Sequence, residues 1–460
     1  MKQDTICALA TANGIGAIGV IRISGDDALS VVQRSFPAKD LSAQKSHTVH
    51  YGYFMDQDEV IDEVMLAIFL APKSFTTENS VEISFHGSPH IGKKILETLI
   101  KNGARMAKAG EFTMRAFMNG RIDLSQAEAI ADIIASENEA SRKVAMSQLK
   151  GGISQEISVL RNDLLNFVSL IELELDFAEE DVEFADRSAL VQLLHKIEFK
   201  LKSLIDSFQY GNAIKSGVAV AIIGKPNAGK STLLNALLKE ERAIVSDIAG
   251  TTRDTIEEVL HIKGNAFRLI DTAGLRETAD EIEKIGVAKA REKVNHAEVL
   301  VYLADANADN FSEDIDLLKS ILREELKVII CATKIDEVLP TKFAQIEDAF
   351  RKEIDSDFDF IAISAVENQN IQDLKNELSS YVEHLKSESN VVITNQRHYE
   401  ALRKSIDSVY RVKEAVSHQI STELLAYELK NALEYLGEIS GEFTNDEVLG
   451  NIFSKFCIGK

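Results

Sequence analysis

A phosphate-binding loop, Gly-Lys-Pro-Asn-Ala-Gly-Lys-Ser, occupies residues 224–231 in the middle of the chain. An apolar run at 218–223 precedes it and a leucine-rich stretch at 232–238 follows it, which predicts a strand before the loop and a helix after it. In that setting backbone N–H groups surround a triphosphate, Lys230 reaches the outer phosphates, and the Ser231 hydroxyl ligates Mg²⁺. The alternative is a glycine-rich turn without function, which the flanking strand and helix disfavour. The motif therefore predicts an α/β domain that binds a nucleotide.

Two stretches of helical periodicity flank this α/β segment. Before it, residues 125–208 place apolar side chains such as Leu160 and Leu164 at helical spacing, with an acidic break around 176–183. After it, residues 399–436 return to the same periodicity. Both apolar stripes have to be buried, and packing the two stretches on each other across the inserted segment does so.

The first part of the chain is predicted to be a separate α+β domain. Strand-like stretches at 18–23 and 81–85 occur there with a helix-like stretch at 91–101. The glycine pattern at 14–19 matches a dinucleotide-binding fingerprint, but a β-type run follows it where that fingerprint needs a helix. The expected fold is thus multidomain α/β plus α, with a Ras-like P-loop G domain inserted into a long-helix domain. The expected domains are 1–120, 121–215, 216–382 and 383–460.

Composition limits the kinds of partner. The 460 residues include 73 acidic and 51 basic ones, for a net charge of -22, which disfavours a surface that coats nucleic acid by bulk charge. Any RNA contact has to be local or shared with a partner. Cys7, Cys331 and Cys457 lie far apart and form neither a disulfide framework nor a zinc-binding pattern. With no membrane-length apolar run and no signal peptide pattern, the expected location is the cytoplasm.

Four further elements follow the P-loop in the order found in GTPases. Adjacent threonines in 250–254 can complete Mg²⁺ coordination when a γ-phosphate is present, and Asp-Thr-Ala-Gly at 271–274 can meet the metal and that phosphate. At 333–336 an aspartate can accept two hydrogen bonds from guanine, a donor pair that adenine lacks, and Ser-Ala at 364–365 matches the loop behind the guanine. The chain resembles translation-factor-type GTPases of the Era-like group, with Thr333 where asparagine is usual.

Leu275 stands where Ras-type enzymes place the glutamine that orients the attacking water. A leucine side chain cannot orient water, so another group has to do so, and another positive charge has to offset the charge on the transferred phosphoryl group. The acidic stretch at 280–284 is close in sequence, although acidic residues also favour the N-terminus of any helix.

Further motifs are spread along the whole chain. They are Arg-Ile-Ser-Gly at 22–25, Gly-Glu-Phe-Thr at 110–113 with Arg-Ala-Phe at 115–117, Asp-Leu-Ser-Gln-Ala-Glu-Ala at 123–129, Asp-Thr-Ala-Gly-Leu-Arg at 271–276, Gly-Glu-Ile at 437–439 with Gly-Glu-Phe-Thr at 441–444, and Phe-Cys-Ile-Gly-Lys at 456–460. Together they resemble the MnmE family of tRNA modification GTPases, also called TrmE. The C-terminal motif is the most specific of them.

This resemblance implies a K⁺-activated GTP hydrolase that forms a homodimer through its N-terminal domain, 1–120. It implies a heterotetramer with the flavoprotein MnmG, also called GidA, that acts on tRNA and not at a membrane. The family adds an aminomethyl or carboxymethylaminomethyl group at C5 of the wobble uridine, U34. The one-carbon donor is 5,10-methylenetetrahydrofolate or a 5-formyl-tetrahydrofolate-like folate bound in the N-terminal domain, with K⁺, Mg²⁺ and GTP at the G domain.

The resemblance also assigns site residues. The catalytic residues would be Lys230 and the water-orienting Glu283, the K⁺ ligands Asn227, Ser246, Ile248 and Thr251, the Mg²⁺ ligands Ser231 and Thr252, and the folate-binding residues Arg22, Glu82, Arg121 and Lys460. The other expected GTP contacts are Ala228, Gly229, Thr232, Asp247, Ala249, Gly250, Asp271, Thr272, Ala273, Gly274, Thr333, Lys334, Asp336, Ser364 and Ala365.

Several of these residues have an ordinary interpretation when taken alone. Glu82 on an alternating strand is then a solvated side chain, and Arg22 is a surface charge. A carboxylate can also accept the paired N–H donors of a pterin, and arginines can hold the acidic tail of a folate. Cys457 could be a nucleophile, but the sequence shows no neighbouring base that would activate it.

Two other classes of function compete with this interpretation. An Era-like ribosome-assembly GTPase would act as an RNA-binding switch, but no Gly-x-x-Gly loop of an RNA-binding domain follows residue 399. A dimerising membrane-remodelling GTPase would also combine long helices with a G domain. The chain has no polybasic or apolar segment suited to a membrane surface, which disfavours that class.

Overall fold

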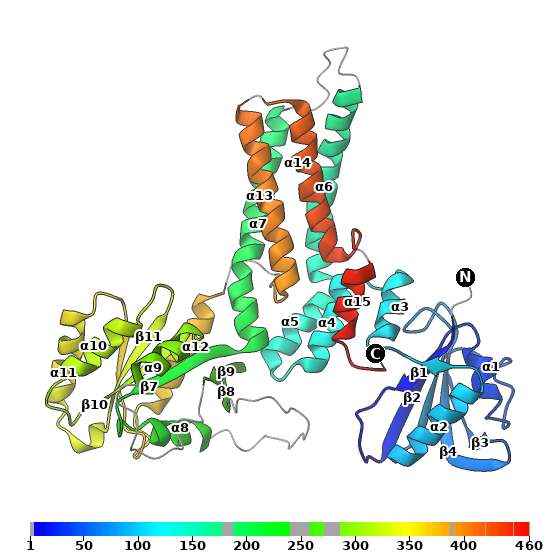
Figure 1. Cartoon of the computed structure of the whole chain (residues 1–460), viewed down its shortest axis with the longest axis horizontal. Helices are drawn as coiled ribbons and strands as arrows, with labels where there is room; N and C mark the ends of the chain where they lie inside the picture. Colours follow the sequence, from blue (N-terminus) through cyan, green and yellow to red (C-terminus); the bar gives the residue numbers. More distant parts are fainter. Residues whose placement is uncertain are drawn as a thin grey trace. The chain divides into compact units, whose positions relative to one another are not determined.

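The computed structural model describes residues 4–176, 187–239, 258–270, 286–386, 391–418, 420–444 and 446–459 of the chain (Figure 1). Contacts divide the chain into two units. The first contains Met1–Ala135, Met146–Leu193 and Asp407–Lys460, and the second contains Ser136–Ala145 and Leu194–Ile406. No helix in the described ranges is both long and apolar enough to span a membrane. The four domain boundaries expected from the sequence remain predictions.

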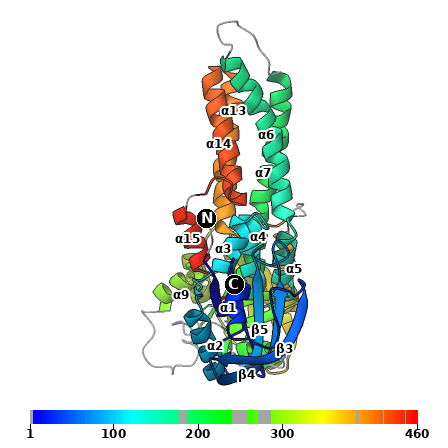
Figure 2. The same cartoon turned by 90° about the vertical axis from the view of Figure 1, so that its right-hand side faces the viewer.

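A six-stranded sheet forms in the first unit, with strand order β3-β4-β5-β2-β1-β6 (Figure 2). Neighbouring strands are antiparallel except β1 and β6, which are parallel. The predicted strands at 18–23 and 81–85 are confirmed as β2 and β5, so a strand does follow the glycines at 14–19. The bounds are β1 Ile6–Leu9, β2 Ile18–Ser24, β3 Thr48–Asp56, β4 Glu59–Phe69, β5 Ser80–His86 and β6 Arg105–Met106.

One face of this sheet packs against two helices, α1 and α2. Ile21 and Ile23 of β2 are fully buried there, in one core with apolar residues of both helices. Because side chains alternate along a strand, Arg22 between them lies on the opposite face. The two helices are α1 Ala28–Gln33 and α2 Pro89–Lys101, the second of which confirms the helix predicted at 91–101.

Buried charges join helix α3, Glu111–Met118, to the sheet. The guanidinium of Arg115 lies 3.2 Å from Glu78, 3.1 Å from Glu111 and 2.7 Å from Asp4. Arg105 also pairs with Glu111 and Asp4. Burial by itself would raise the pKa of Glu111, but hydrogen bonds from Arg105, from a backbone N–H and from Arg115 hold that pKa below its ordinary value. The network is therefore charged at neutral pH.

The long helices α6 and α14 of the first unit confirm that helical stretches from both sides of the inserted segment pack on each other. Buried residues of α6, including Leu160 and Leu164, recur at helical spacing, and Lys430 of α14 lies 2.5 Å from Glu172 of α6. The periodicity predicted over 399–436 is divided between two helices, α13 and α14. The bounds are α4 Leu124–Ala135, α6 Gly152–Asp176, α13 Gln396–Ser417, α14 Thr422–Ser440 and α15 Asp446–Ser454.

The second unit contains the predicted inserted α/β domain, a six-stranded sheet with strand order β12-β11-β10-β7-β9-β8. Neighbouring strands are parallel except β8 and β9. This confirms the Ras-like P-loop fold class, because strands alternate with helices around a P-loop strand. The bounds are β7 Val218–Gly224, β8 Glu258–Ile262, β9 Asn265–Leu269, β10 Val299–Asp305, β11 Lys327–Thr333 and β12 Asp359–Ala362.

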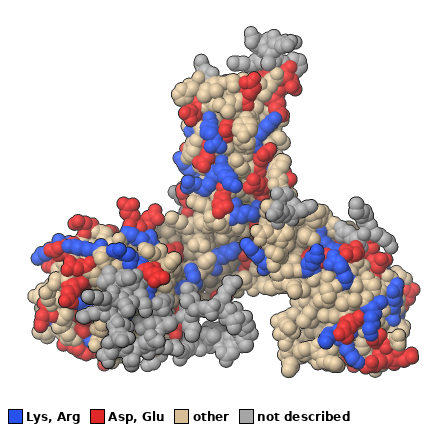
Figure 3. All heavy atoms as spheres, viewed as in Figure 1, with Lys and Arg blue, Asp and Glu red and all other residues tan. Residues whose placement is uncertain are grey.

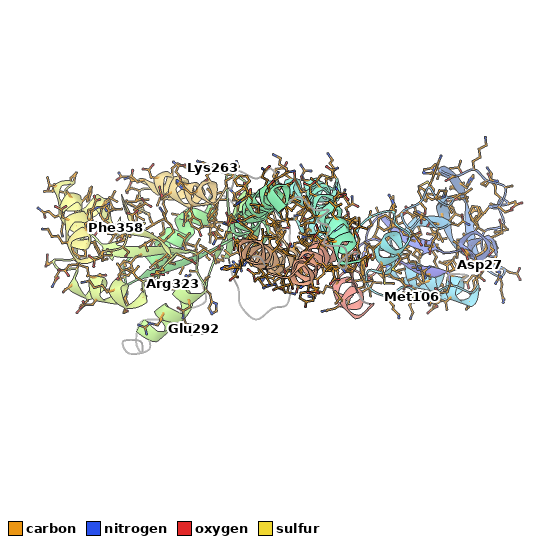
Figure 4. The ribbon with its side chains drawn as sticks, turned by 90° about the horizontal axis from the view of Figure 1, so that it is seen from above. Asp27, Met106, Lys263, Glu292, Arg323 and Phe358 are labelled. Carbon is orange, nitrogen blue, oxygen red and sulfur yellow. The ribbon has the colours of Figure 1, made fainter. Side chains whose placement is uncertain are left out.

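Helices cover both faces of this second sheet. Leu233 of α8 belongs to the core on one face, and Leu318 of α10 belongs to the core on the other. Arg351 at the end of α11 lies over the ring of Phe358, which Figure 4 labels, at 4.7 Å from the ring centroid. The bounds are α8 Lys230–Lys239, α9 Gly286–Asn295, α10 Ser312–Ile321, α11 Thr341–Glu353 and α12 Ile371–His384. Helices α5 Glu139–Leu149, α7 Arg187–Ser216 and α13 each contain residues of both units.

We expect Arg115→Met to lower the free energy of unfolding by about 3–5 kcal/mol at neutral pH, because it leaves buried carboxylates without this guanidinium. Urea unfolding followed by circular dichroism measures the change. Because the pKa of Glu111 is lowered in the folded protein, the contribution of the network is fully present above the ordinary carboxyl pKa and is lost as the pH falls through the lowered pKa. The difference between the two proteins should therefore shrink in acid.

Lys93→Met is the matched control, because Lys93 pairs with Glu97 at 3.8 Å on an exposed helix face. Exposed pairs contribute at most about 1 kcal/mol. Equal destabilisation by the two substitutions would contradict the role assigned to the buried network.

Candidate functional site

The P-loop lies between the end of β7 and the start of α8, as the sequence predicts. Two of its residues have positive φ angles, 65° at Asn227 and 91° at Gly229, which turn the chain around the phosphate position. Gly224 passes so close to β10 that a Cβ there would lie 2.6 Å from the carbonyl oxygen of Leu303. A side chain at position 224 would therefore push the loop away from the sheet.

Lys230 begins helix α8 and turns back into the loop. Its Nζ donates to the carbonyl oxygens of Gly224 and Lys225, the second at 3.1 Å. Burial lowers the pKa of this ammonium group, with a smaller effect from the charge of Lys293. The loop thus holds the ammonium group of Lys230 beside the backbone that would surround the outer phosphates.

The loop predicted to contact guanine is hydrogen-bonded to the P-loop. Thr333, the last residue of β11, is buried, and its Oγ1 lies 2.9 Å from the carbonyl oxygen of Ala228. The next residue, Lys334, has a φ of 58°, and its Nζ lies 2.6 Å from Asp305 at the end of β10. The threonine at the position where asparagine is usual therefore connects the P-loop to the loop predicted to contact guanine.

The remaining predicted guanine contacts lie at the same edge of the sheet. Asp336 is in a short 3₁₀ helix, Ile335–Glu337, directly after Lys334. Ser364 follows β12, exchanges backbone hydrogen bonds with Gln369, and accepts the N–H of Glu367 on its Oγ at 3.1 Å. Parallel strands end at one edge of a sheet, so these loops and the P-loop face the same space.

Lys225, inside the P-loop, makes contacts that sequence patterns did not predict. Its Nζ lies 2.7 Å from Glu313 and 2.9 Å from Asp314, both in the first turn of α10. The hydroxyl of Tyr302 in β10 lies 2.8 Å from Asp314, and burial raises the pKa of this tyrosine. The P-loop is thus tied to α10 through a carboxylate and a buried hydroxyl.

Most of the predicted switch and cation residues lie outside the described part of the chain. They are Ser246, Asp247, Ile248, Ala249, Gly250, Thr251, Thr252, Asp271, Thr272, Ala273, Gly274, Leu275 and Glu283. Of the predicted K⁺ and Mg²⁺ ligands, the structure describes Asn227 and Ser231. The described ranges hold no group of three or more His, Cys, Asp or Glu side chains that could bind a metal ion.

The predicted folate-binding residues Arg22, Glu82 and Arg121 come together in the first unit. Arg22 and Glu82 are directly opposite each other on β2 and β5, with Nε 2.9 Å from Oε1. The guanidinium groups of Arg22 and Arg121 lie 5.2 Å and 5.1 Å from the ring centroid of Phe75, and Arg22 is also 5.7 Å from that of Phe112. Sequence patterns did not assign either ring to this site, since Phe75 and Phe112 are both distant from Arg22 in the chain. The fourth predicted residue, Lys460, lies outside the described residues.

The C-terminal motif docks against this same N-terminal sheet. Ile458 forms an antiparallel bridge with Ala109, and Gly110 donates its N–H to the carbonyl of Cys457 at 3.4 Å. Gly459 is buried with a φ of 94°, and a Cβ there would lie 2.2 Å from the carbonyl oxygen of Leu9. Leu9 ends the strand that pairs with β2, the strand of Arg22. Glycine is therefore required at the point where the C-terminus meets the sheet.

Comparisons with known proteins agree with this architecture. A family model described as the MnmE helical domain matches residues 124–457, and one described as the GTP-binding protein TrmE N-terminus matches residues 5–121. The chain belongs to the MnmE family of tRNA modification GTPases. The MnmE proteins of Flavobacterium johnsoniae and Flavobacterium psychrophilum are 50% and 51% identical to it, over 100% of this chain and 100% and 99% of theirs. A solved structure of Era from Aquifex aeolicus bound to GDP and AlF4⁻ is 25% identical over 41% of this chain and 66% of its own, with a TM-score of 0.28, too low to support an argument.

We expect Thr333→Val to weaken binding of a fluorescent GDP analogue by about 2-fold to 10-fold. The substitution keeps the shape of the side chain but removes the hydrogen bond to the P-loop carbonyl, for which about 0.5–1.5 kcal/mol is typical. Thr333→Ser retains the hydroxyl and serves as the control. If the valine and serine variants bind equally, the hydrogen bond does not organise the nucleotide site.

Proposed function

We propose that this protein hydrolyses GTP with activation by K⁺ and, with the flavoprotein MnmG, modifies C5 of the wobble uridine U34 of tRNA. The added group is aminomethyl or carboxymethylaminomethyl, and a methylenetetrahydrofolate or 5-formyl-like folate provides the one-carbon unit. The protein works in the cytoplasm as a homodimer that forms a heterotetramer with MnmG. The observation that carries the proposal is that one chain of this family holds both a P-loop and a separate arginine–carboxylate pair next to aromatic rings.

The nucleotide part of the proposal is supported by the loops around the P-loop. Asn227 and Gly229 turn the P-loop backbone, and Thr333, in the loop proposed to contact guanine through Asp336, is hydrogen-bonded to Ala228 of the P-loop. Because Leu275 cannot orient water, the proposal assigns that role to Glu283, which lies outside the described residues.

Asn227 and Ser231 are the described residues that would hold cations. The left-handed backbone of Asn227 places an amide side chain within the P-loop, and Ser231 lies in the first turn of α8, so oxygen donors suited to K⁺ and Mg²⁺ border the phosphate position. When bound, the two cations would supply positive charge next to the phosphates. The other proposed ligands are Ser246, Ile248, Thr251 and Thr252.

The folate part of the proposal is supported by the cluster around Arg22. Glu82 is only 29% exposed and is held by the guanidinium of Arg22, so its carboxylate is fixed in direction. A fixed carboxylate can accept the paired N–H donors of a pterin. Phe75 offers an aromatic surface between Arg22 and Arg121, and we propose that Lys460 adds a positive charge there.

GTP turnover by the purified protein should be at least about tenfold faster in K⁺ than in Na⁺, a difference of about 1.4 kcal/mol or more in activation free energy. Asn227→Ala should remove this difference, because it removes a proposed K⁺ ligand. Phosphate release measures the rates. Asn235→Ala, an exposed asparagine of α8, should retain the full difference. Equal rates of the unchanged protein in both salts would refute the K⁺ assignment.

Nucleoside analysis of tRNA from cells that lack this protein should show the loss of C5-modified wobble uridines. The native gene should restore them and the Glu82→Gln variant should not, because the neutral amide cannot replace a charged acceptor for the pterin. Purified Glu82→Gln protein should hydrolyse GTP normally. Unchanged wobble uridines in the deletion strain, with altered ribosomal subunit levels, would favour the alternative of an Era-like ribosome-assembly GTPase.

A further inference from the structure

Lys225 is the first P-loop residue beyond the paired part of β7. The ladder between β7 and β10 ends where Gly224 is paired with Leu303, so the chain leaves the sheet at the next residue. The backbone carbonyl of Lys225 accepts the Nζ of Lys230 at 3.1 Å and the N–H of Ala228 at 3.2 Å. The position of this one peptide group therefore affects both the lysine predicted to reach the outer phosphates and the turn of the loop.

The side chain of Lys225 is anchored to the first turn of α10 by two carboxylates that differ in exposure. Its Nζ lies 2.7 Å from Glu313, whose side chain is 82% exposed, and 2.9 Å from Asp314, whose side chain is 4% exposed. Burial by itself would lower the pKa of the Lys225 ammonium, but the hydrogen bonds to Glu313 and Asp314 raise that pKa above its ordinary value. Because exposed ion pairs are weak, the buried Asp314 is the partner that fixes the lysine.

Asp314 is itself held in place from the middle of the sheet. Its Oδ1 accepts the hydroxyl of Tyr302 at 2.8 Å, while its Oδ2 contacts Lys225. Tyr302 is fully buried in β10, where it is paired with Ile223, the residue before the P-loop. Ile315, the next residue of α10, belongs to the apolar core on that face of the sheet. The carboxylate of Asp314 is therefore a fixed anchor for the P-loop.

This buried pair differs from the other ion pairs of α10. Acidic and basic side chains lie side by side on the surface of the α/β domain (Figure 3), and Lys319 of α10 is 2.8 Å from Glu353 of α11 with both side chains exposed. Asp314 is instead buried and hydrogen-bonded to a buried hydroxyl. Since a well-packed apolar pair is often as stable as a buried ion pair, stability alone does not account for a carboxylate at this position.

We propose that Asp314 is a positioning residue for GTP hydrolysis that acts on the P-loop through Lys225. By fixing the peptide group of Lys225, it keeps Lys230 and Asn227 at the positions from which they would act on the outer phosphates. Small displacements of such groups affect the transition state of phosphoryl transfer strongly, because catalysis there depends on placement and charge. The proposal rests on the GTP hydrolysis of the proposed function and adds a residue to its machinery.

The competing explanation is that Lys225 binds a phosphate itself. Two carboxylates already contact its ammonium group, at 2.7 Å and 2.9 Å, and they would repel a phosphate at the same place. The two explanations differ in their effect on nucleotide affinity. A phosphate ligand contributes to binding of GDP and GTP, whereas a residue that positions the loop affects turnover more than affinity.

The test is GTP turnover by the full-length protein in K⁺, measured by phosphate release and expressed per nucleotide-binding site. Sites are titrated with a fluorescent GDP analogue, so a loss of folded protein does not count as a loss of turnover. Asp314→Asn keeps the shape of the side chain but removes its charge, and it should lower kcat about tenfold. Affinity for the GDP analogue should change by less than about threefold. Lys225→Met should have the same two effects, and Lys225→Arg, which keeps the charge, should retain most of kcat.

The double variant Lys225→Met/Asp314→Asn shows whether the two residues act together. If Asp314 acts through Lys225, the double variant should be as slow as Lys225→Met alone, because the second substitution then removes nothing further. Effects that multiply to a loss of about a hundredfold would show independent action and contradict the proposal. Lys319→Met is the matched control, since it removes a lysine that pairs with a carboxylate at the other end of the same helix. It should leave kcat within about twofold.

Two further results would overturn the proposal. A normal kcat per binding site in Asp314→Asn would show that the carboxylate does not position the loop. A loss of affinity for the GDP analogue in Lys225→Met but not in Asp314→Asn would show that the lysine binds phosphate itself. The proposed function fails on other measurements, namely the salt dependence of the unchanged protein and the nucleoside analysis of the deletion strain, so the two failures are distinguishable.

Discussion

The parallel pairing of β7, β10 and β11 is the constraint on which the nucleotide site depends. Parallel strands deliver their carboxyl ends to one edge, so loops that are far apart in the chain meet there. Gly224 makes this pairing possible, because a side chain would collide with the carbonyl of Leu303. Thr333 then hydrogen-bonds to Ala228, a residue 105 positions earlier in the chain. This hydrogen bond joins the P-loop to the loop predicted to contact guanine.

The N-terminal sheet uses its two faces differently. One face is an apolar core under α1 and α2, and the opposite face carries Arg22 and Glu82. Aromatic rings cover the arginine, and the C-terminal motif ends beside the neighbouring strand at Gly459. Charge is tolerated in this region because it is paired, as Arg115 and its carboxylates show. Paired charged side chains can therefore occupy one face of a sheet whose other face is an apolar core.

The parts that could be predicted from sequence are those whose residues are close together in the chain. The P-loop, the strands at 18–23 and 81–85, and the stripe that includes Leu160 depend on local spacing, and the structure confirms all of them. Sequence patterns did not reveal the tie between Lys225 and Asp314 or the ring of Phe75, because no local spacing relates residues of different elements. The roles of the predicted switch residues stay predictions.

The sequence by itself determined the chemistry available to this protein. It contains a P-loop with Asn227, a threonine at position 333 where asparagine is usual, and motifs near both chain ends that identify the family. Those features depend only on residue type and on short spacing along the chain, so they can be recognised without the folded structure. Only the tertiary structure decided that Arg22 faces Glu82 and that Gly459 packs against Leu9. Strand register and helix packing set these neighbours, and both depend on the burial of apolar side chains across the whole domain.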